Sequence, residues 1–299
     1  MAASSGVDPL TAPLTYPGRP PRRPAVLIAG SDVFDVHSAR AAALGQWRVR
    51  LAGRPAPDGV AGAAGAGGSG SHAGADQPLD YFLRQQGVPP IGRRAPVLSV
   101  GSNASPAQVQ RKMANAGLRT AVPITSVRVQ GITVGVSAHV SKPGYVPATP
   151  VSDPAAVSDL WVLWLDPPAL SALDATEPNY QRIRLSSRYA VHLRPGQPVP
   201  GCSVYVSRHG HLVNQAGAPR ILTDQATLIT GLLTQVPTLT TLAGTTPAEW
   251  IRRTRDARVR DGIRALFLAA GIVREAGIEA GTQAGTRAGT RAGRERGPR

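Results

Sequence analysis

A run of glycine, alanine and serine across residues 53–77 divides this chain of 299 residues into two unequal parts. Such a run has few side chains that a hydrophobic core could bury, and it predicts a flexible linker. A second run, an Ala-Gly repeat, begins at Ala276 and continues to the C-terminus. It predicts a disordered tail for the same reason. The segment between the two runs is therefore the part of the chain expected to fold around a core.

These two runs set the expected boundaries. Residues 1–77 are predicted to form a partly disordered N-terminal region and linker, rich in proline, glycine and alanine. Residues 78–272 are predicted to form the folded domain, with its core between 96 and 240 and a C-terminal helix. Residues 273–299 are predicted to be the disordered tail. A domain of this size can bury enough apolar surface to fold without disulfides or metal ions.

The N-terminal region contains two short patterned segments. Residues 25–29 predict a strand and residues 38–50 predict a helix, whereas residues 1–24 lack periodicity and are expected to be an extended arm. Two arrangements stay open for this region. It either packs beside the core or covers a pocket as a lid.

The single cysteine, Cys202, excludes an internal disulfide and any metal site built from several cysteines. It lies in a run that is typical of a strand, which predicts a buried and unreactive thiol. No apolar run approaches the roughly 20 residues that a membrane-spanning helix needs. The N-terminus also lacks a basic segment followed by an apolar stretch, so we expect no signal peptide and a cytoplasmic protein.

The formal net charge of +15 raises the question of a nucleic-acid partner. The positive excess is spread along the chain, and only 4% of residues are aromatic. Clustered charge with aromatic platforms, which is typical of polyanion sites, is therefore missing. All basic residues except Lys112 and Lys142 are arginine, which resembles the codon bias of a GC-rich bacterial genome. We expect no nucleic-acid partner, and binding through the arginine-rich ends stays as an alternative.

The pattern between residues 96 and 240 predicts an α+β fold. A strand over 96–100 leads into the turn Gly101-Ser102-Asn103, and Ser105, Pro106 and Gln108 then form a helix-starting capping box. The rest is mostly β structure, with a Pro- and Gly-containing loop over 143–156 and a short helix after Asp166. The expected strands cover 124–130, 132–140, 159–165, 180–193 and 203–208. This order suggests a mixed sheet curled toward a barrel, with flanking helices.

A second capping box, at residues 246–249, predicts a helix that runs to about Ala270. Its apolar residues recur at helical spacing and are expected to pack on the domain rather than to bind a partner. They are Trp250, Ile251, Ile263, Leu266, Phe267 and Ala270.

Most catalytic motifs are absent from the sequence, including a nucleophile elbow, a P-loop and an H-E-x-x-H pair. The spacing G-x-G-x-x-G occurs at residues 65–70, but it lies in the linker, without the strand and helix that a dinucleotide site needs. His209 and His211 have no identifiable third metal ligand. These residues therefore predict neither a dinucleotide site nor a metal site.

Two features remain that can carry chemistry. The Gly101 turn joins a strand to a helix, and the free N–H groups at a helix start favour an anion such as a carboxylate. Glu177 follows a short helix and precedes a strand, a place from which a carboxylate can project into a pocket. Each feature alone is common, because tight turns need glycine for steric reasons and loop glutamates are usually solvated.

Together the two features resemble the γ-glutamyl cyclotransferase-like family. Its members begin with a strand ending in Y-G-S-N and later carry L-x-x-L-D-x-x-E-G followed by an aromatic residue. Gly101, Ser102 and Asn103 match the turn, and Glu177 matches the catalytic carboxylate of the family. Further matches are Leu170, Leu173, Asp174 and the aromatic Tyr180. The resemblance covers about half of the chain.

The resemblance implies an enzyme that needs no cofactor. The α-carboxylate of a γ-glutamyl compound would lie on the backbone amides of residues 101–103. Glu177 would take a proton from the substrate amine, which attacks its own γ-carbonyl, and would pass that proton to the leaving amine. The products would be 5-oxoproline and an amine or amino acid. Residues expected to bind the substrate are Val100, Gly101, Ser102, Asn103 and Tyr180.

The sequence departs from the family pattern at two positions. Val100 replaces the tyrosine before the turn, which removes a polar wall of the pocket, and Pro178 replaces the glycine after the glutamate, which stiffens the backbone beside Glu177. These departures motivate an alternative. The chain would then be a diverged, non-catalytic module of the same fold that binds a small metabolite or a partner.

Overall fold

The computed structural model describes residues 8–28, 32–38, 42–51, 76–194 and 196–281. The predicted linker lies almost entirely outside these residues, as do the glycine motif at 65–70 and most of the Ala-Gly repeat.

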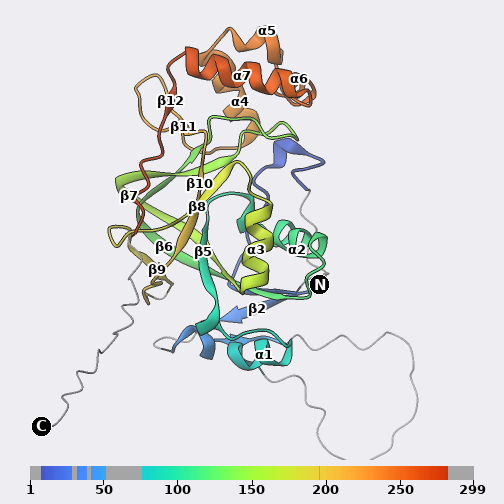
Figure 1. Cartoon of the computed structure of the whole chain (residues 1–299), viewed down its shortest axis with the longest axis vertical. Coiled ribbons are helices and arrows are strands. Elements are labelled where there is room, and N and C mark those ends of the chain that lie inside the picture. Colours follow the sequence, from blue (N-terminus) through green and yellow to red (C-terminus); the bar gives the residue numbers. More distant parts are fainter. Residues whose placement is uncertain (1–7, 29–31, 39–41, 52–75, 195, 282–299) are drawn as a thin grey trace, which may run out of the picture.

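The domain is built on a mixed sheet of ten strands, which runs through its centre in Figure 1. Its order is β4-β3-β2-β1-β6-β7-β5-β10-β8, and β9 pairs with β6. β5 and β10 are parallel, and the other pairs are antiparallel. The strands are β1 (Ala25–Ile28), β2 (Val33–His37), β3 (Arg48–Val49), β4 (Gln77–Pro78), β5 (Ala95–Ser99), β6 (Ala121–Val136), β7 (Ala148–Leu165), β8 (Tyr180–Arg184), β9 (Val191–Leu193) and β10 (Ser203–Ser207).

The α+β class and the flanking helices are confirmed, but the expectation of a curled barrel is wrong. β4 and β8 stand at opposite ends of the strand order and do not pair, so the sheet has two free edges. Closing a barrel requires the two edge strands to hydrogen-bond to each other. An α+β sequence pattern predicts paired strands, but it does not say whether the outermost two will meet.

Helices cover the sheet in two groups (Figure 1). α2 (Pro106–Asn115) and α3 (Pro167–Ala175) pack together beside the central strands, and α1 (Leu79–Gln85) lies below them. A helical unit at the other end consists of α4 (Gln225–Gln235), α5 (Leu239–Ala243), α6 (Pro247–Arg253) and α7 (Ala257–Ala269). A two-stranded sheet of β11 (His211–Leu212) and β12 (Val273–Arg274) adjoins it. None of the helices in the described residues is long and apolar enough to cross a membrane.

The predicted C-terminal helix is divided into α6 and α7. Thr254 and Arg255 separate the two, and Asp256 then caps α7 by accepting a hydrogen bond from Arg258 N at 2.9 Å. Most of the apolar stripe packs on the domain as predicted, since Trp250, Ile263 and Phe267 are fully buried, but Ala270 is exposed. The buried residues form one core cluster with residues from the end of β6.

β7 occupies most of the segment that the sequence analysis assigned to a loop over 143–156. The prolines misled that prediction, because a proline cannot donate a ladder hydrogen bond. The N–H groups of Ala148 and Ser152 donate to Tyr16 and Ala276. The N–H groups of even-numbered residues in this part of β7 therefore point away from β6. Pro150 is also even-numbered and lies opposite Val134, so its missing N–H removes no hydrogen bond between β6 and β7.

Residues up to Pro78 contribute four strands to the sheet. The helix predicted over 38–50 is wrong for the described part, which contains a short 3-10 helix (Leu44–Gln46) and β3. Trp47 and Val49 are both fully buried, a spacing of two that suits a strand rather than a helix. At the other end of the chain, residues 273–281 also pack on the domain, and Ser152 N and Ser186 N donate to Ala276 O and Glu279 O.

Candidate functional site

The turn after β5 is shaped by its neighbours in space. Gly101 starts a short 3-10 helix (Ser102–Ala104), and Pro106 at the first position of α2 starts the next. A Cβ atom on residue 101 would overlap the hydroxyl of Tyr16 and lie 3.1 Å from the Cβ of Ala148. Glycine is therefore needed here because a tyrosine from the N-terminal region approaches the backbone.

Glu177 lies in the tight connection between α3 and β8. Asp166 caps the start of α3 by accepting from Ala169 N at 3.0 Å. At the other end, Glu177 N donates to Asp174 O at 3.1 Å, and Tyr180 N donates to Glu177 O at 3.0 Å. These bonds and the fixed φ of Pro178 hold the backbone that carries the carboxylate.

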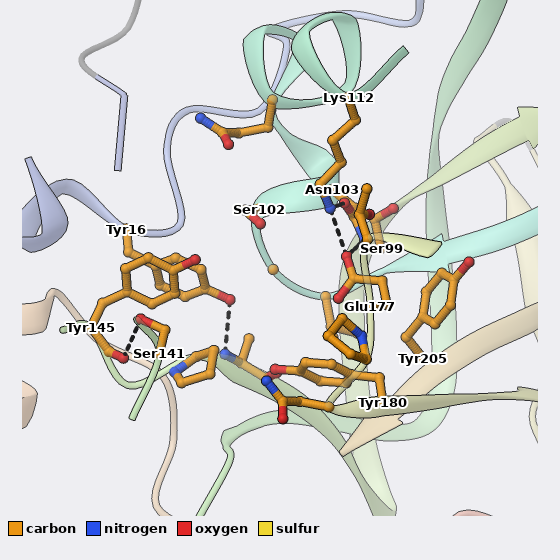
Figure 2. A pocket seen from close by; sticks show the side chains of 18 of the residues that line it. Tyr16, Ser99, Ser102, Asn103, Lys112, Ser141, Tyr145, Glu177, Tyr180 and Tyr205 are labelled. Atoms are coloured by element: carbon orange, nitrogen blue, oxygen red, sulfur yellow. Dashed lines mark hydrogen bonds and ion pairs between the residues drawn. The ribbon is translucent and has the colours of Figure 1, made fainter. Parts of the chain in front are cut away.

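The carboxylate of Glu177 meets the Gly101 turn directly. Asn103 Nδ2 donates to Glu177 Oε1 at 3.0 Å, and Lys112 Nζ on α2 lies 2.6 Å from the same oxygen (Figure 2). Lys112 Nζ also donates to Asn103 Oδ1 at 2.7 Å. The Lys112 and Glu177 side chains are 13% and 14% exposed, so this ion pair is mostly shielded from water. No partner of Glu177 Oε2 is found among the described residues.

A cavity of about 210 Å³ lies beside this network. Tyr16, Tyr145, Tyr180 and Tyr205 form much of its wall, and Figure 2 shows Tyr16 and Tyr145 opposite Glu177. The Tyr16 and Tyr145 rings are stacked, with centroids 4.2 Å apart and planes 16° apart. A cavity this small, with a charged group at one side, suits a small polar metabolite.

Tyr16 brings a hydroxyl into this wall from the N-terminal region. Its oxygen accepts a hydrogen bond from Ala148 N at 2.8 Å, and its own hydrogen has no acceptor among the described residues. Burial raises the pKa of Tyr16 well above its usual range, and the nearby Tyr145 and Glu177 act in the same direction. Tyr16 therefore remains a protonated donor next to the Gly101 turn.

The N-terminal segment (residues 8–18) is held in place by polar contacts to α2. Asp8 forms an ion pair with Arg111, and its Oδ1 accepts from Gln108 Nε2 at 2.8 Å. The short 3-10 helix of this segment (Pro13–Thr15) contacts α4 and α6. The sequence left open whether the N-terminal region packs beside the core or covers a pocket as a lid. In the structure, part of this region forms a wall of the cavity.

The helical unit fixes the loop that carries Tyr145. The side chain of Gln225, fully buried on α4, accepts from Val146 N at 2.8 Å and donates to Val146 O at 3.0 Å. Trp250 Nε1 on α6 donates to Gly144 O at 2.9 Å. The position of Tyr145 thus depends on two helices that lie about 80 to 100 residues later in the chain.

The structure brings the six residues proposed from the sequence to one cavity. Val100, Gly101, Ser102, Asn103, Glu177 and Tyr180 all line it. Tyr180 donates from its hydroxyl to Ala148 O at 2.8 Å, and burial raises the pKa of Tyr180. Asp174, a motif residue, does not line the cavity but binds Arg182 at 2.9 Å and accepts from the Tyr205 hydroxyl at 2.7 Å.

Sequence reasoning missed many of the lining residues, and those that carry a polar or titratable group include Tyr16, Arg111, Lys112 and His139. Tyr16 lies in a segment without periodicity, and Arg111 and Lys112 look like ordinary polar residues of a helix. One signal pointed to Lys112, which is one of only two lysines in a chain whose basic residues are otherwise arginine.

Metal-ligand residues do not gather in this structure. Within the described ranges, no group of three or more His, Cys, Asp and Glu side chains has the geometry to hold a metal ion. His209 Nε2 lies 3.1 Å from Asn179 Oδ1, whereas His211 is buried in β11. Cys202 is buried as predicted, and burial raises its pKa to about 12, which disfavours the reactive thiolate.

Comparison with solved structures finds a chain named "Gamma-glutamyl cyclotransferase". The match has 12% sequence identity and a TM-score of 0.33, and it covers 57% of this chain and 98% of that one. No family model matches the sequence, and no curated protein matches it.

Proposed function

We propose that the cavity binds a γ-glutamyl compound and releases 5-oxoproline from it, with Glu177 as the general base and acid. The observation that supports this most strongly is the hydrogen bond between Asn103 and Glu177. It joins the two motifs that resemble the cyclotransferase-like family, although they are 74 residues apart in the chain.

The reaction needs a base that can reach an amine. Oε1 of Glu177 is occupied by Asn103 and Lys112, so Oε2 is the oxygen that would accept a proton from the substrate ammonium. The free amine then attacks the γ-carbonyl carbon, forming a C–N bond and a tetrahedral intermediate. When the original amide C–N bond breaks, Glu177 returns the proton to the departing nitrogen. The ring nitrogen loses its second hydrogen to the released amine, which leaves as an ammonium ion.

Binding of the glutamyl part relies on the polar groups around the turn. Its α-carboxylate would accept from backbone N–H groups of residues 101–103, close to the positive charge of Lys112. The Tyr16 hydroxyl supplies a further donor on this side, where Val100 offers none. In a cavity of about 210 Å³ the substrate is held folded, which favours ring closure.

One observation favours a second candidate, a module that binds a metabolite without turning it over. Lys112 forms an ion pair with the Glu177 carboxylate and balances its charge. A carboxylate held in this ion pair can anchor a charged ligand without moving a proton. Under this alternative, the same groups would hold a small zwitterion and no bond would break.

The two candidates are separated by incubating the purified full chain with γ-glutamyl dipeptides, glutathione and γ-glutamyl amines, and measuring free 5-oxoproline. Release with saturation kinetics supports the enzyme. Saturable binding of a γ-glutamyl compound, measured by calorimetry without any product, would support the binding module instead.

A further inference from the structure

The cavity is also lined by a buried histidine that the proposed reaction does not use. His139 is 7% exposed and lines the cavity together with Tyr180, whose ring lies edge-on at a centroid distance of 6.0 Å. Arg264 on α7 donates to Ala138 O at 3.0 Å, directly beside this histidine. His139 therefore lies between the cavity and the helical unit.

One buried serine binds the inner nitrogen of this imidazole, and a second buried serine binds the first. Ser137 Oγ lies 2.5 Å from His139 Nδ1 and 2.6 Å from Ser207 Oγ. Ser207 Oγ also accepts a hydrogen bond from His209 N at 3.0 Å. The three side chains of Ser207, Ser137 and His139 thus form a continuous polar chain that ends at the cavity.

The direction of this chain follows from counting donors and acceptors. If Ser207 donates to Ser137, and Ser137 donates to Nδ1 of His139, both hydroxyl hydrogens are used. The reverse direction leaves the Ser207 hydroxyl hydrogen without an acceptor among the described residues. Burying an unpaired hydroxyl is unfavourable, so the first direction holds and the hydrogen of the imidazole is on Nε2.

The ring is neutral over the physiological pH range. Burial lowers the pKa of His139 to about 3, and the nearby His209 and Arg264 act in the same direction. Nε2 has no hydrogen-bond partner among the described residues and is not enclosed by protein atoms. A neutral imidazole held in this way presents one fixed N–H donor to the cavity.

We propose that His139 Nε2 donates a hydrogen bond to a carbonyl or carboxylate oxygen on the leaving part of the bound ligand. The direction of the ligand rests on the proposed function, in which the glutamyl part occupies the end with Glu177 and the Gly101 turn. The leaving part then extends toward His139. The positive charge of Arg264 beyond the imidazole favours a negatively charged acceptor there and disfavours an ammonium group.

The tautomer can be measured in the full chain without any ligand. Two-dimensional ¹⁵N–¹H NMR of the imidazole groups should show the His139 hydrogen on Nε2. Ser137→Ala should remove that preference and populate the Nδ1–H form. A wild-type ring with its hydrogen on Nδ1 would overturn the proposal, whether or not the protein is an enzyme.

Binding to the Glu177→Gln chain, in which the ligand persists, tests the recognition itself. The probes are γ-glutamyl-alanine, which carries a carboxylate on its leaving part, and γ-glutamyl-ethylamine, which does not. Adding His139→Phe should weaken the binding of γ-glutamyl-alanine about tenfold and leave the binding of γ-glutamyl-ethylamine unchanged. His139→Gln, which keeps an N–H donor near the position of Nε2, should restore most of the loss.

If His139→Phe weakens the binding of both probes equally, or does not weaken the binding of γ-glutamyl-alanine, a donor role for His139 is contradicted. The proposed reaction fails in a different way. If the binding pattern holds but the wild-type chain makes no 5-oxoproline, the His139 contact stands and the catalytic assignment of Glu177 falls.

Discussion

Lys112 Nζ lies 2.6 Å from Glu177 Oε1 and 2.7 Å from Asn103 Oδ1, so one ammonium joins the turn before α2 to the turn after α3. The ion pair both positions the carboxylate and balances its charge in a shielded place. Removing one partner should therefore lower the free energy of unfolding more than removing both.

Lys112→Met should lower the free energy of unfolding by about 3 kcal/mol, because it leaves the Glu177 charge buried without a counter-charge. The double variant Lys112→Met/Glu177→Gln should recover most of this loss in urea unfolding. The matched control is Arg188→Met, which breaks the exposed pair with Glu279 and should cost less than about 1 kcal/mol. Equal losses in the single and double variants would show that the two charges are not coupled.

Gly101→Ala should destabilise the chain by about 2 kcal/mol, since the new methyl group overlaps the Tyr16 hydroxyl. Tyr16→Phe should relieve much of this loss, because the Tyr16 Cζ atom would lie 3.5 Å from the added Cβ, an ordinary contact. Thermal unfolding of the two single variants and the double variant measures this coupling. If the two effects simply add, Tyr16 does not lie against the turn in solution.

Gln225→Leu should loosen the loop that carries Tyr145 by leaving both backbone groups of Val146 unpaired in a buried place. We expect a loss of about 3 kcal/mol in stability and weaker binding of any γ-glutamyl ligand. Gln215→Leu, an exposed position, serves as the control and should change neither quantity. Unchanged ligand affinity in Gln225→Leu would mean that the loop does not depend on α4.

Acid should release the N-terminal segment. Burial alone would raise the pKa of Asp8, but hydrogen bonds from Leu10, Gln108 and Arg111 outweigh it and lower the pKa below 3.8. The stabilisation is therefore complete above pH 3.8 and is lost as the pH falls through the lower value of the folded state. Hydrogen exchange of residues 8–18 should accelerate over this range, and Asp8→Asn should exchange fast at every pH. A wild-type segment that stays equally protected at pH 3 would contradict this.

The local parts of the site could be predicted from the sequence. The strand, turn and helix around Gly101 follow from apolar runs, glycine and Pro106, and the short helix before Glu177 follows from its start at Asp166. What joins them is a hydrogen bond between residues 74 positions apart, and no local pattern encodes it. Only the resemblance to a family suggested that the two turns would meet.

Other parts depend on tertiary contacts that local propensity cannot predict. Tyr16 enters the wall because Ala148 N, 132 residues later, donates to its hydroxyl. The prolines of β7 predicted a loop. Whether a proline disrupts a sheet depends on which side its missing N–H would face, and strand pairing sets that side. The closure of the sheet was predicted wrongly for the same reason, since it depends on strands at the two ends of the order.

The proposed role of Glu177 in moving the proton is tested most directly by the rate of 5-oxoproline release by Glu177→Gln. The amide keeps the size of the side chain and one acceptor oxygen for Asn103, but it cannot take up a proton at neutral pH. With the γ-glutamyl compound that the wild type uses best, the rate should fall by about 10²- to 10⁴-fold. Glu275→Gln, at an exposed position, should keep the wild-type rate. A Glu177→Gln protein that is folded and retains the wild-type rate would show that Glu177 does not move the proton.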